Sequence, residues 1–114
     1  MHGEYAGGLY SWSAQATEAY EQARHQVASF IGAQAREVVF TSGTTASINL
    51  VAWAYMKNQI QPNQTILITP LEHHANMIPW QRLAKACQCR LDFIPLTDDY
   101  AIDMPALKAL LEQQ

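Results

Sequence analysis

The chain has 114 residues, of which 49% are hydrophobic, and a formal net charge of −3. This length and apolar content suit one small globular domain, and the lack of a lysine and arginine cluster argues against binding to a nucleic-acid backbone. No apolar run approaches the roughly 20 residues that span a bilayer, and the N-terminus lacks the regions of a signal peptide, so we expect a soluble, cytoplasmic protein.

The first third of the chain predicts an irregular lead-in and one helix. Residues 1–12 are rich in glycine and tyrosine without periodicity, so we expect them to be irregular. From Ser13, a residue type that caps helices, apolar residues recur at steps of three and four, and Gly32 is placed to end the helix. The recurring residues are Ala16, Tyr20, Ala23, Val27, Phe30 and Ile31. They form one apolar stripe on the predicted helix.

Strands and helices alternate through the rest of the chain. The β-prone runs are residues 37–41, 65–69 and 90–94. Helices are predicted after Gly43, from an N-cap at Asn76 with Pro79 in the first turn, and from an N-cap at Asp103. Strands separated by helices of roughly a dozen residues favour parallel βαβ units. The predicted fold class is therefore α/β with a parallel sheet.

The segment Thr41-Ser42-Gly43-Thr44-Thr45 joins a predicted strand to a predicted helix, where ligands collect in parallel α/β sheets. Gly43 lets the backbone come close to a ligand, and the free N–H groups of the helix with the Thr44 and Thr45 hydroxyls suit a phosphate. The segment lacks the lysine and length of a Walker P-loop, which disfavours nucleoside triphosphate hydrolysis. By itself, such a segment is most often only a turn and an N-cap.

A second polar segment, Glu72-His73-His74-Ala75-Asn76, follows the next predicted strand at the same edge of the sheet. One histidine could stack on an aromatic ring or transfer a proton, since the imidazole pKa is about 6.5, and Glu72 could orient or charge its neighbour. The alternatives are a solvated loop with locally bonded histidines and a metal site. A metal site is disfavoured because no further ligands follow at helical spacing. Together, the two polar segments suit a phosphorylated aromatic cofactor.

The two cysteines, Cys87 and Cys89, are too few for a disulfide framework, and their spacing would strain a bond between them. A structural zinc site needs four ligands in paired clusters, whereas this pair supplies two. We therefore expect reduced thiols at the edge of a strand.

Several segments in this chain resemble those of one enzyme family. They are Ser13-Ala14-Gln15-Ala16-Thr17, Val39-Phe40-Thr41-Ser42-Gly43-Thr44-Thr45 with Ser47-Ile48-Asn49-Leu50-Val51-Ala52 after it, Glu72-His73-His74-Ala75-Asn76 with Pro79-Trp80, and Pro95-Leu96-Thr97-Asp98-Asp99. In this order they are similar to segments of the SufS/CsdA-type cysteine desulfurases, in the class V aminotransferase family. The resemblance implies that residues 13–114 are part of the large, pyridoxal 5′-phosphate-binding domain of an aspartate aminotransferase-like fold.

The resemblance also implies roles for individual residues. Thr44 and Thr45 would bind the phosphate of pyridoxal 5′-phosphate, while His73 would stack on the pyridine ring and assist proton transfer as the catalytic residue. The family reaction converts L-cysteine to L-alanine and leaves the sulfur as an enzyme-bound persulfide, with the cofactor as electron sink. By the same resemblance, the parent enzyme would be a homodimer that passes sulfur to an acceptor protein in sulfur metabolism and iron–sulfur cluster assembly.

Other residues that this chemistry requires do not occur in the chain. It has no Ser-x-His-Lys-type motif for the Schiff-base lysine, no Asp-x-x-Gln-type segment and no segment with the persulfide cysteine. Its three lysines, Lys57, Lys85 and Lys108, are typical of solvated helix charges. The stretch Ala6-Gly7-Gly8 stands where the family usually has a His-Arg-Gly-like sequence.

We therefore expect a fragment of a cysteine desulfurase that is inactive alone. Missing strands would leave an unpaired sheet edge and an uncovered apolar face. The main alternative is a non-catalytic α/β interaction module or a degenerate remnant of the family. A less favoured alternative is a phosphate- or nucleotide-binding domain that uses only the turn at Gly43.

Overall fold

The structure, a computed structural model, describes the backbone of residues 2–113 and the side chains of residues 11–113. The chain divides into two compact units, Met1–Thr41 and Ser42–Gln114, whereas its composition predicts a single domain. Each unit has buried apolar residues of its own. These are Ala28 and Val38 in the first unit, and Ala52, Ile68, Leu83 and Ala84 in the second.

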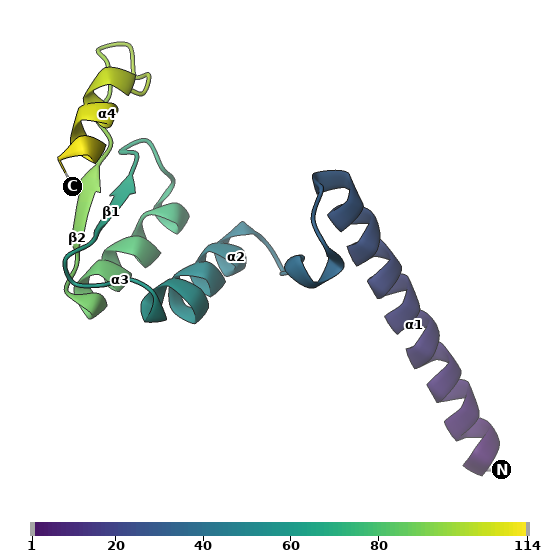
Figure 1. Ribbon diagram of the computed structural model, residues 1–114. Coiled ribbons are helices and arrows are strands. Elements are labelled where there is room, and N and C mark those ends of the chain that lie inside the picture. Colours follow the sequence, from purple (N-terminus) through teal and green to yellow (C-terminus); the bar gives the residue numbers. More distant parts are fainter. Residues whose placement is uncertain (1, 114) are drawn as a thin grey trace. The chain divides into compact units, whose positions relative to one another are not determined.

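The first unit begins with the long helix α1 (His2–Ile31), coloured purple to blue in Figure 1. The prediction that residues 1–12 form an irregular lead-in before an N-cap at Ser13 is wrong, because residues 2–12 already belong to this helix. Met1 lies outside the described residues. A formed helix extends without a new nucleation step, since each added residue contributes one hydrogen bond. This extension carries α1 through three glycines that lower its intrinsic propensity.

The predicted end of this helix at Gly32 is confirmed. Gly32 has φ +72°, a left-handed conformation that residues with a Cβ rarely adopt. The Gly32 N–H donates to the Ser29 carbonyl at 3.3 Å, and the Ala33 N–H donates to the Ala28 carbonyl at 2.8 Å. These two bonds form a Schellman motif, which satisfies carbonyl groups at the end of the helix.

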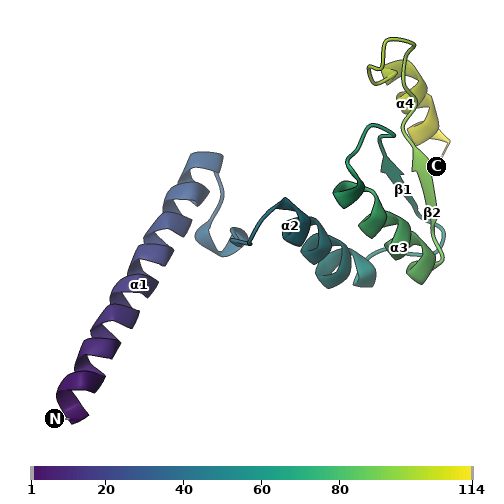
Figure 2. The same ribbon diagram turned by 180° about the vertical axis from the view of Figure 1, so that it is seen from behind.

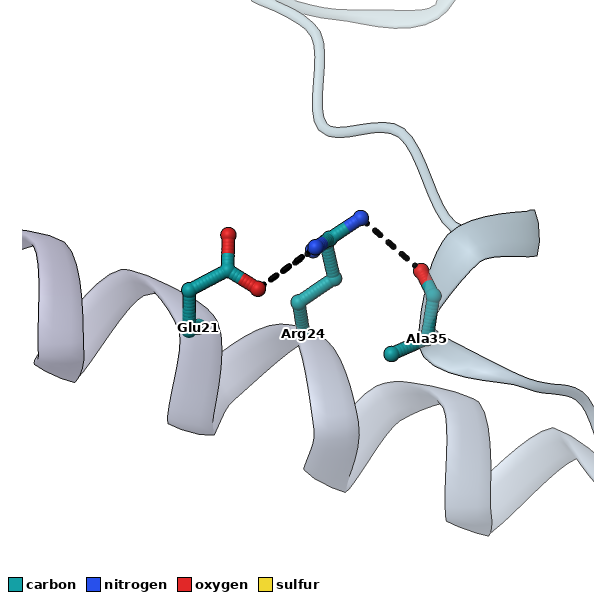
Figure 3. A network of polar contacts seen from close by, with 3 residues as sticks. All are labelled: Glu21, Arg24 and Ala35. Atoms are coloured by element: carbon teal, nitrogen blue, oxygen red, sulfur yellow. Dashed lines mark hydrogen bonds and ion pairs between the residues drawn. The ribbon is translucent and has the colours of Figure 1, made fainter.

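The segment after α1 folds back along the helix. Figure 3 shows Arg24 between Glu21 and Ala35: its Nε donates to Oε2 of Glu21 at 3.1 Å, and its Nη1 donates to the Ala35 carbonyl at 3.0 Å. Farther along, the Tyr20 and Phe40 rings meet edge to face with centroids 5.2 Å apart. The return of the chain is thus held by one guanidinium and one aromatic pair.

The strand predicted at residues 37–41 is not formed. Its first residue ends the short turn η1 (Ala35–Glu37), and residues 38–41 have no regular structure. Val38 has extended torsions, φ −109° and ψ 124°, but extended backbone becomes a strand only when a neighbour pairs with it. The two strands that the described residues form both lie in the second unit.

The second unit contains the sheet and the shorter helices, coloured teal to yellow in Figure 1. Helix α2 (Thr44–Leu50) continues into the short π-helix η2 (Val51–Tyr55) and the 3₁₀ helix η3 (Met56–Asn58). Strand β1 (Thr65–Ile68) is followed by η4 (His74–Asn76) and α3 (Ile78–Cys87), and strand β2 (Arg90–Phe93) is followed by α4 (Met104–Glu112).

Strands β1 and β2 pair in parallel with Thr65 opposite Arg90 and Ile68 opposite Phe93, which confirms the α/β fold class. Just past the strands, the Ile94 N–H donates to the Ile68 carbonyl at 2.8 Å. Helix α3 is the crossover connection, and both views place it beside the sheet (Figures 1 and 2). Its residue Leu83 is fully buried. The sheet therefore contains two of the three predicted strands, and both strands lie on its edges.

One of the two predicted helix caps of the second unit is confirmed and the other is wrong. Oδ1 of Asp103 accepts from the Ala106 N–H at 3.0 Å and caps α4 as predicted. Helix α3 has Pro79 in its first turn as predicted, but its N-cap is Met77 and not Asn76. The Asn76 side chain is instead bonded to other side chains, as described below.

Large apolar side chains remain on the surface of both units, in keeping with the expected uncovered faces. Phe30 is 91% exposed, and Ile31 and Leu111 are more than half exposed. Cys87 and Cys89 are both free thiols, as expected. Within residues 2–113, no helix combines the length and apolarity that a membrane crossing requires.

Candidate functional site

The first polar segment forms the start of α2. Gly43 is the N-cap, with an extended backbone that any residue can adopt (φ 163°, ψ 179°), and no atom beyond its two neighbours in the chain lies within 4 Å of the place where a Cβ would stand. Thr44 and Thr45 are the first two residues of the helix, and both are exposed. Because the first N–H groups of a helix have no partner within it, this end offers donors next to two hydroxyls.

The second polar segment, residues 72–76, is here called the histidine turn. It follows β1 beyond its carboxyl end and contains the three-residue turn η4. Nδ1 of His73 accepts a hydrogen bond from the Ala75 N–H at 3.1 Å, so this side chain caps η4. An imidazole nitrogen that accepts carries no proton, and the neutral ring therefore has its proton on Nε2. His73 and His74 are exposed, with ring centroids 6.2 Å apart.

The Glu72 carboxylate bonds on both sides of the turn. Its Oε1 accepts from the Thr69 hydroxyl at 3.0 Å, and its Oε2 accepts from Nδ2 of Asn76 at 3.0 Å. Oδ1 of Asn76 in turn accepts from the indole N–H of Trp80 at 2.8 Å. The sequence suggests Glu72 as a group that could orient or charge its histidine neighbour, whereas these bonds join its carboxylate to Thr69 and Asn76. The bonded pairs are three, four and four residues apart in the sequence. Side chains at these spacings are neighbours in turns and helices, so the spacing is the sequence signal for such bonds.

Thr45 and His74 line one hollow of about 220 Å³ between α2, the histidine turn and α3. Its other lining residues are Asn49, Ala75, Ile78, Pro79 and Arg82. The two polar segments were expected to meet at the carboxyl edge of a shared sheet, but the strand before the first segment is not formed. They meet instead through contacts between α2 and η4. Thr44 and His73 are not among the residues that line the hollow.

The polar groups around this hollow are suited to an anion. Thr45 offers a hydroxyl, His74 an imidazole and Arg82 a guanidinium, and a guanidinium binds phosphate or carboxylate through two parallel N–H bonds. Among residues 11–113, Arg82 forms no ion pair, and the lining includes no carboxylate. These donors fit the phosphate of the implied cofactor. Arg82 could have been found in the sequence as the one basic residue in the middle of α3.

Within the described residues, no group of three or more histidine, cysteine, aspartate and glutamate side chains is arranged to hold a metal ion. The thiols are also far from this chemistry in the fold. Cys87 is the last residue of α3, where its Sγ contacts the Lys57 carbonyl at 3.8 Å, and Cys89 lies between that helix and β2.

Comparison with known proteins gives one consistent result. All 114 residues match the family model described as Aminotransferase class-V. A cysteine desulfurase of Pectobacterium atrosepticum is 47% identical over 97% of this chain and 28% of its own length. A probable cysteine desulfurase of Staphylococcus epidermidis is 43% identical over 94% of this chain and 26% of its own length.

Solved structures agree with these matches. The apo cysteine desulfurase of Thermococcus onnurineus NA1 superposes with a TM-score of 0.74 and 41% identity, over 82% of this chain and 23% of that one. The S-sulfonic acid form of the cysteine desulfurase CsdA of Escherichia coli superposes with a TM-score of 0.74 and 34% identity, over 89% of this chain and 26% of that one. The chain spans 23–28% of the length of these four proteins. With a family match over its whole length, this chain belongs to the class V aminotransferases.

Proposed function

We propose that this chain is a segment of the cofactor-binding domain of a pyridoxal 5′-phosphate-dependent cysteine desulfurase. The family is pyridoxal-phosphate-dependent in general, and relatives across nearly the whole chain are cysteine desulfurases. The single observation that supports a cofactor site in this segment is the hollow that Thr45 and His74 share. The complete enzyme would convert L-cysteine to L-alanine and an enzyme-bound persulfide, act as a cytoplasmic homodimer, and pass the sulfur to an acceptor protein for iron–sulfur cluster assembly.

In this proposal the start of α2 binds the phosphate. The Thr44 and Thr45 hydroxyls donate to it together with the first N–H groups of the helix, where the positive end of the helix dipole favours an anion. The helical path continues from α2 into η2, so the aligned peptide dipoles extend beyond the seven residues of α2 itself. Arg82, from α3, adds a positive charge at the neighbouring hollow.

His73 provides a flat surface and a proton donor beside the phosphate. Its imidazole is exposed and can stack on the pyridine ring. Because Nδ1 is engaged with the Ala75 N–H, Nε2 is the atom that can donate a proton or a hydrogen bond to a ligand. The bound cofactor would supply an electron sink for breaking the carbon–sulfur bond. The 114 residues lack the lysine and cysteine motifs of the family, so we expect them not to catalyse the reaction alone.

Binding of pyridoxine 5′-phosphate to the purified protein tests the site. This probe keeps the ring and phosphate but has no aldehyde, so it cannot react with Lys57, Lys85 or Lys108. We expect saturable binding, followed by fluorescence and by ³¹P NMR, that is about tenfold tighter than binding of pyridoxine, which lacks the phosphate. Equal binding of the two compounds would remove the phosphate site from the proposal.

A second measurement tests the expected lack of catalysis. The protein is incubated with pyridoxal 5′-phosphate and L-cysteine, and alanine is measured over time. We expect no alanine beyond the amount formed by the free cofactor. Alanine at enzymatic rates would contradict the inactivity of these residues. Absence of both alanine and any saturable binding would favour the alternative, a non-catalytic α/β module that keeps only the fold.

A further inference from the structure

We propose that Thr69, Glu72, Asn76 and Trp80 form a positioning network that holds the histidine turn for ligand binding. The proposal rests on the proposed function of that turn, but it concerns residues that bind no ligand themselves. The network is a continuous chain of three hydrogen bonds, from the Thr69 hydroxyl to Glu72, from the Asn76 amide to Glu72, and from the Trp80 indole to Asn76.

The network connects two rigid elements across an irregular segment. Thr69 directly follows β1, and Trp80 lies in the first turn of α3. Between them, η4 has only three residues, and 3₁₀ turns have poorer hydrogen-bond geometry than α-helices. Such a turn gains little stability from its backbone alone. Side-chain bonds at both of its ends therefore determine where its imidazoles stand.

The two hydrogen bonds that the Glu72 carboxylate accepts are strong ones. Both oxygens of the Glu72 carboxylate are used, each at 3.0 Å, and bonds to an ionised acceptor are stronger than bonds between neutral groups. Glu72, Asn76 and Trp80 are each half-buried, which limits competition from water. Both functions of the Asn76 amide are used, because its Nδ2 donates to Glu72 while its Oδ1 accepts from Trp80.

The network acts on the histidines through the backbone. The Asn76 N–H donates to the His73 carbonyl at 2.8 Å, and the Met77 N–H donates to the His74 carbonyl at 3.1 Å. Fixing Asn76 from both sides thus fixes the backbone of His73, and with it the bond from the Ala75 N–H to Nδ1 of His73. The role of the network is to select the turn conformation in which His73 has its proton on Nε2.

The test compares Thr69→Val, which removes the hydroxyl at nearly constant volume, with Thr69→Ser, which keeps it. Thr65→Val is the matched control, because Thr65 is the half-buried threonine at the other end of β1. In the protein without ligand, ¹⁵N NMR reports the tautomer of His73, and hydrogen exchange reports the Ala75 amide. Binding of pyridoxine 5′-phosphate is measured separately.

We expect Thr69→Val to speed exchange of the Ala75 amide and weaken binding of the probe, each about tenfold. The His73 ring should also lose its preference for a proton on Nε2. Thr69→Ser and Thr65→Val should match the parent in all three measurements. Glu72→Met, which keeps the length of the side chain but has no oxygen to accept either bond, should act in the same direction as Thr69→Val.

Two results would overturn the proposal in distinguishable ways. An unchanged tautomer and unchanged Ala75 exchange in both Thr69→Val and Glu72→Met would show that the network does not hold the turn. A loosened turn with unchanged affinity for the probe would show that its position does not matter for the ligand. Absence of probe binding by the parent protein itself would instead overturn the proposed function of the turn.

Discussion

Thr45 of α2 and His74 of η4 line the same hollow of about 220 Å³, on the side of the histidine turn that faces α2. Neither residue lies in a strand, and the strand predicted before the first polar segment is not formed. The meeting of the two segments therefore depends on the packing of α2 against η4.

Replacing Thr45 tests this relationship directly. Thr45→Ala removes a hydroxyl donor from the proposed phosphate site, and we expect binding of pyridoxine 5′-phosphate to weaken about tenfold or more, since a hydrogen bond to a charged group contributes about 1.5–3 kcal/mol. Thr45→Ser should restore most of the affinity. Isothermal titration measures both variants, and an unchanged affinity for Thr45→Ala would exclude this residue from the site.

Gly32 should be required at the end of α1 because of its conformation. Gly32→Ala places a Cβ at φ +72°, which we expect to destabilise the first unit by about 1–2 kcal/mol. Gly32→Asn should have a smaller effect, because asparagine tolerates the left-handed region. Urea unfolding, followed by the helical circular dichroism signal, measures the free energy of unfolding. If the motif matters, this free energy should be highest with glycine at position 32, lower with asparagine and lowest with alanine. Equal stability of the alanine variant would contradict it.

Asp103 should protect the first turn of α4. Asp103→Ala removes the acceptor of the Ala106 N–H, and we expect exchange of this amide to become about fivefold faster, which corresponds to a cap of about 1 kcal/mol. Asp98→Ala is the control, since Asp98 lies in the preceding turn outside the cap. Similar exchange in the two variants would mean that the cap contributes nothing.

Cys89 should react slowly with alkylating reagents. Burial raises the pKa of the Cys89 thiol, and a negative charge on Cys87 raises it further. A raised pKa means less thiolate at a given pH, and the thiolate is the reactive form. We expect iodoacetamide to modify Cys89 more slowly than a cysteine in an unfolded peptide, with the clearest difference near the usual thiol pKa of about 8.5.

The variant Cys87→Ser separates the two causes of that shift. It removes the neighbouring charge but leaves the burial of Cys89, so alkylation of Cys89 should become faster without reaching the rate of the unfolded peptide. Mass spectrometry of the alkylated protein measures both rates over a pH series. Modification of Cys89 at the peptide rate in the parent protein would contradict the raised pKa.

Much of the second unit follows from local sequence signals. The β-prone runs at residues 65–69 and 90–94 correspond to β1 and β2 within one residue at their ends. The caps at Gly32 and Asp103 depend on bonds to residues five or fewer positions away. Such features are predictable because the conformation of one residue and its close neighbours decides them.

The candidate site was only partly predictable. The sequence indicates Thr44, Thr45 and His73 through their resemblance to family motifs, and their roles as ligands stay predictions. The bonds of Glu72 to Thr69 and Asn76, and the position of Arg82 beside Thr45, depend on how the turn packs between β1 and α3. The spacing of these residues in the sequence allows the contacts, but other pairings of the same side chains are equally compatible with that spacing.

The sequence by itself determined the α/β class, the family and the parallel pairing. These follow from the spacing of apolar residues, the turn residues and the order of the motifs, all of which can be read from the sequence without a structure. Tertiary structure decided that residues 38–41 form no strand, that Met77 and not Asn76 caps α3, and that Thr45 meets His74. The missing strand and the meeting of Thr45 with His74 depend on residues distant in the chain. The cap of α3 depends on which hydrogen-bond partners the Asn76 side chain takes. Local propensity contains no information about distant partners or about this competition.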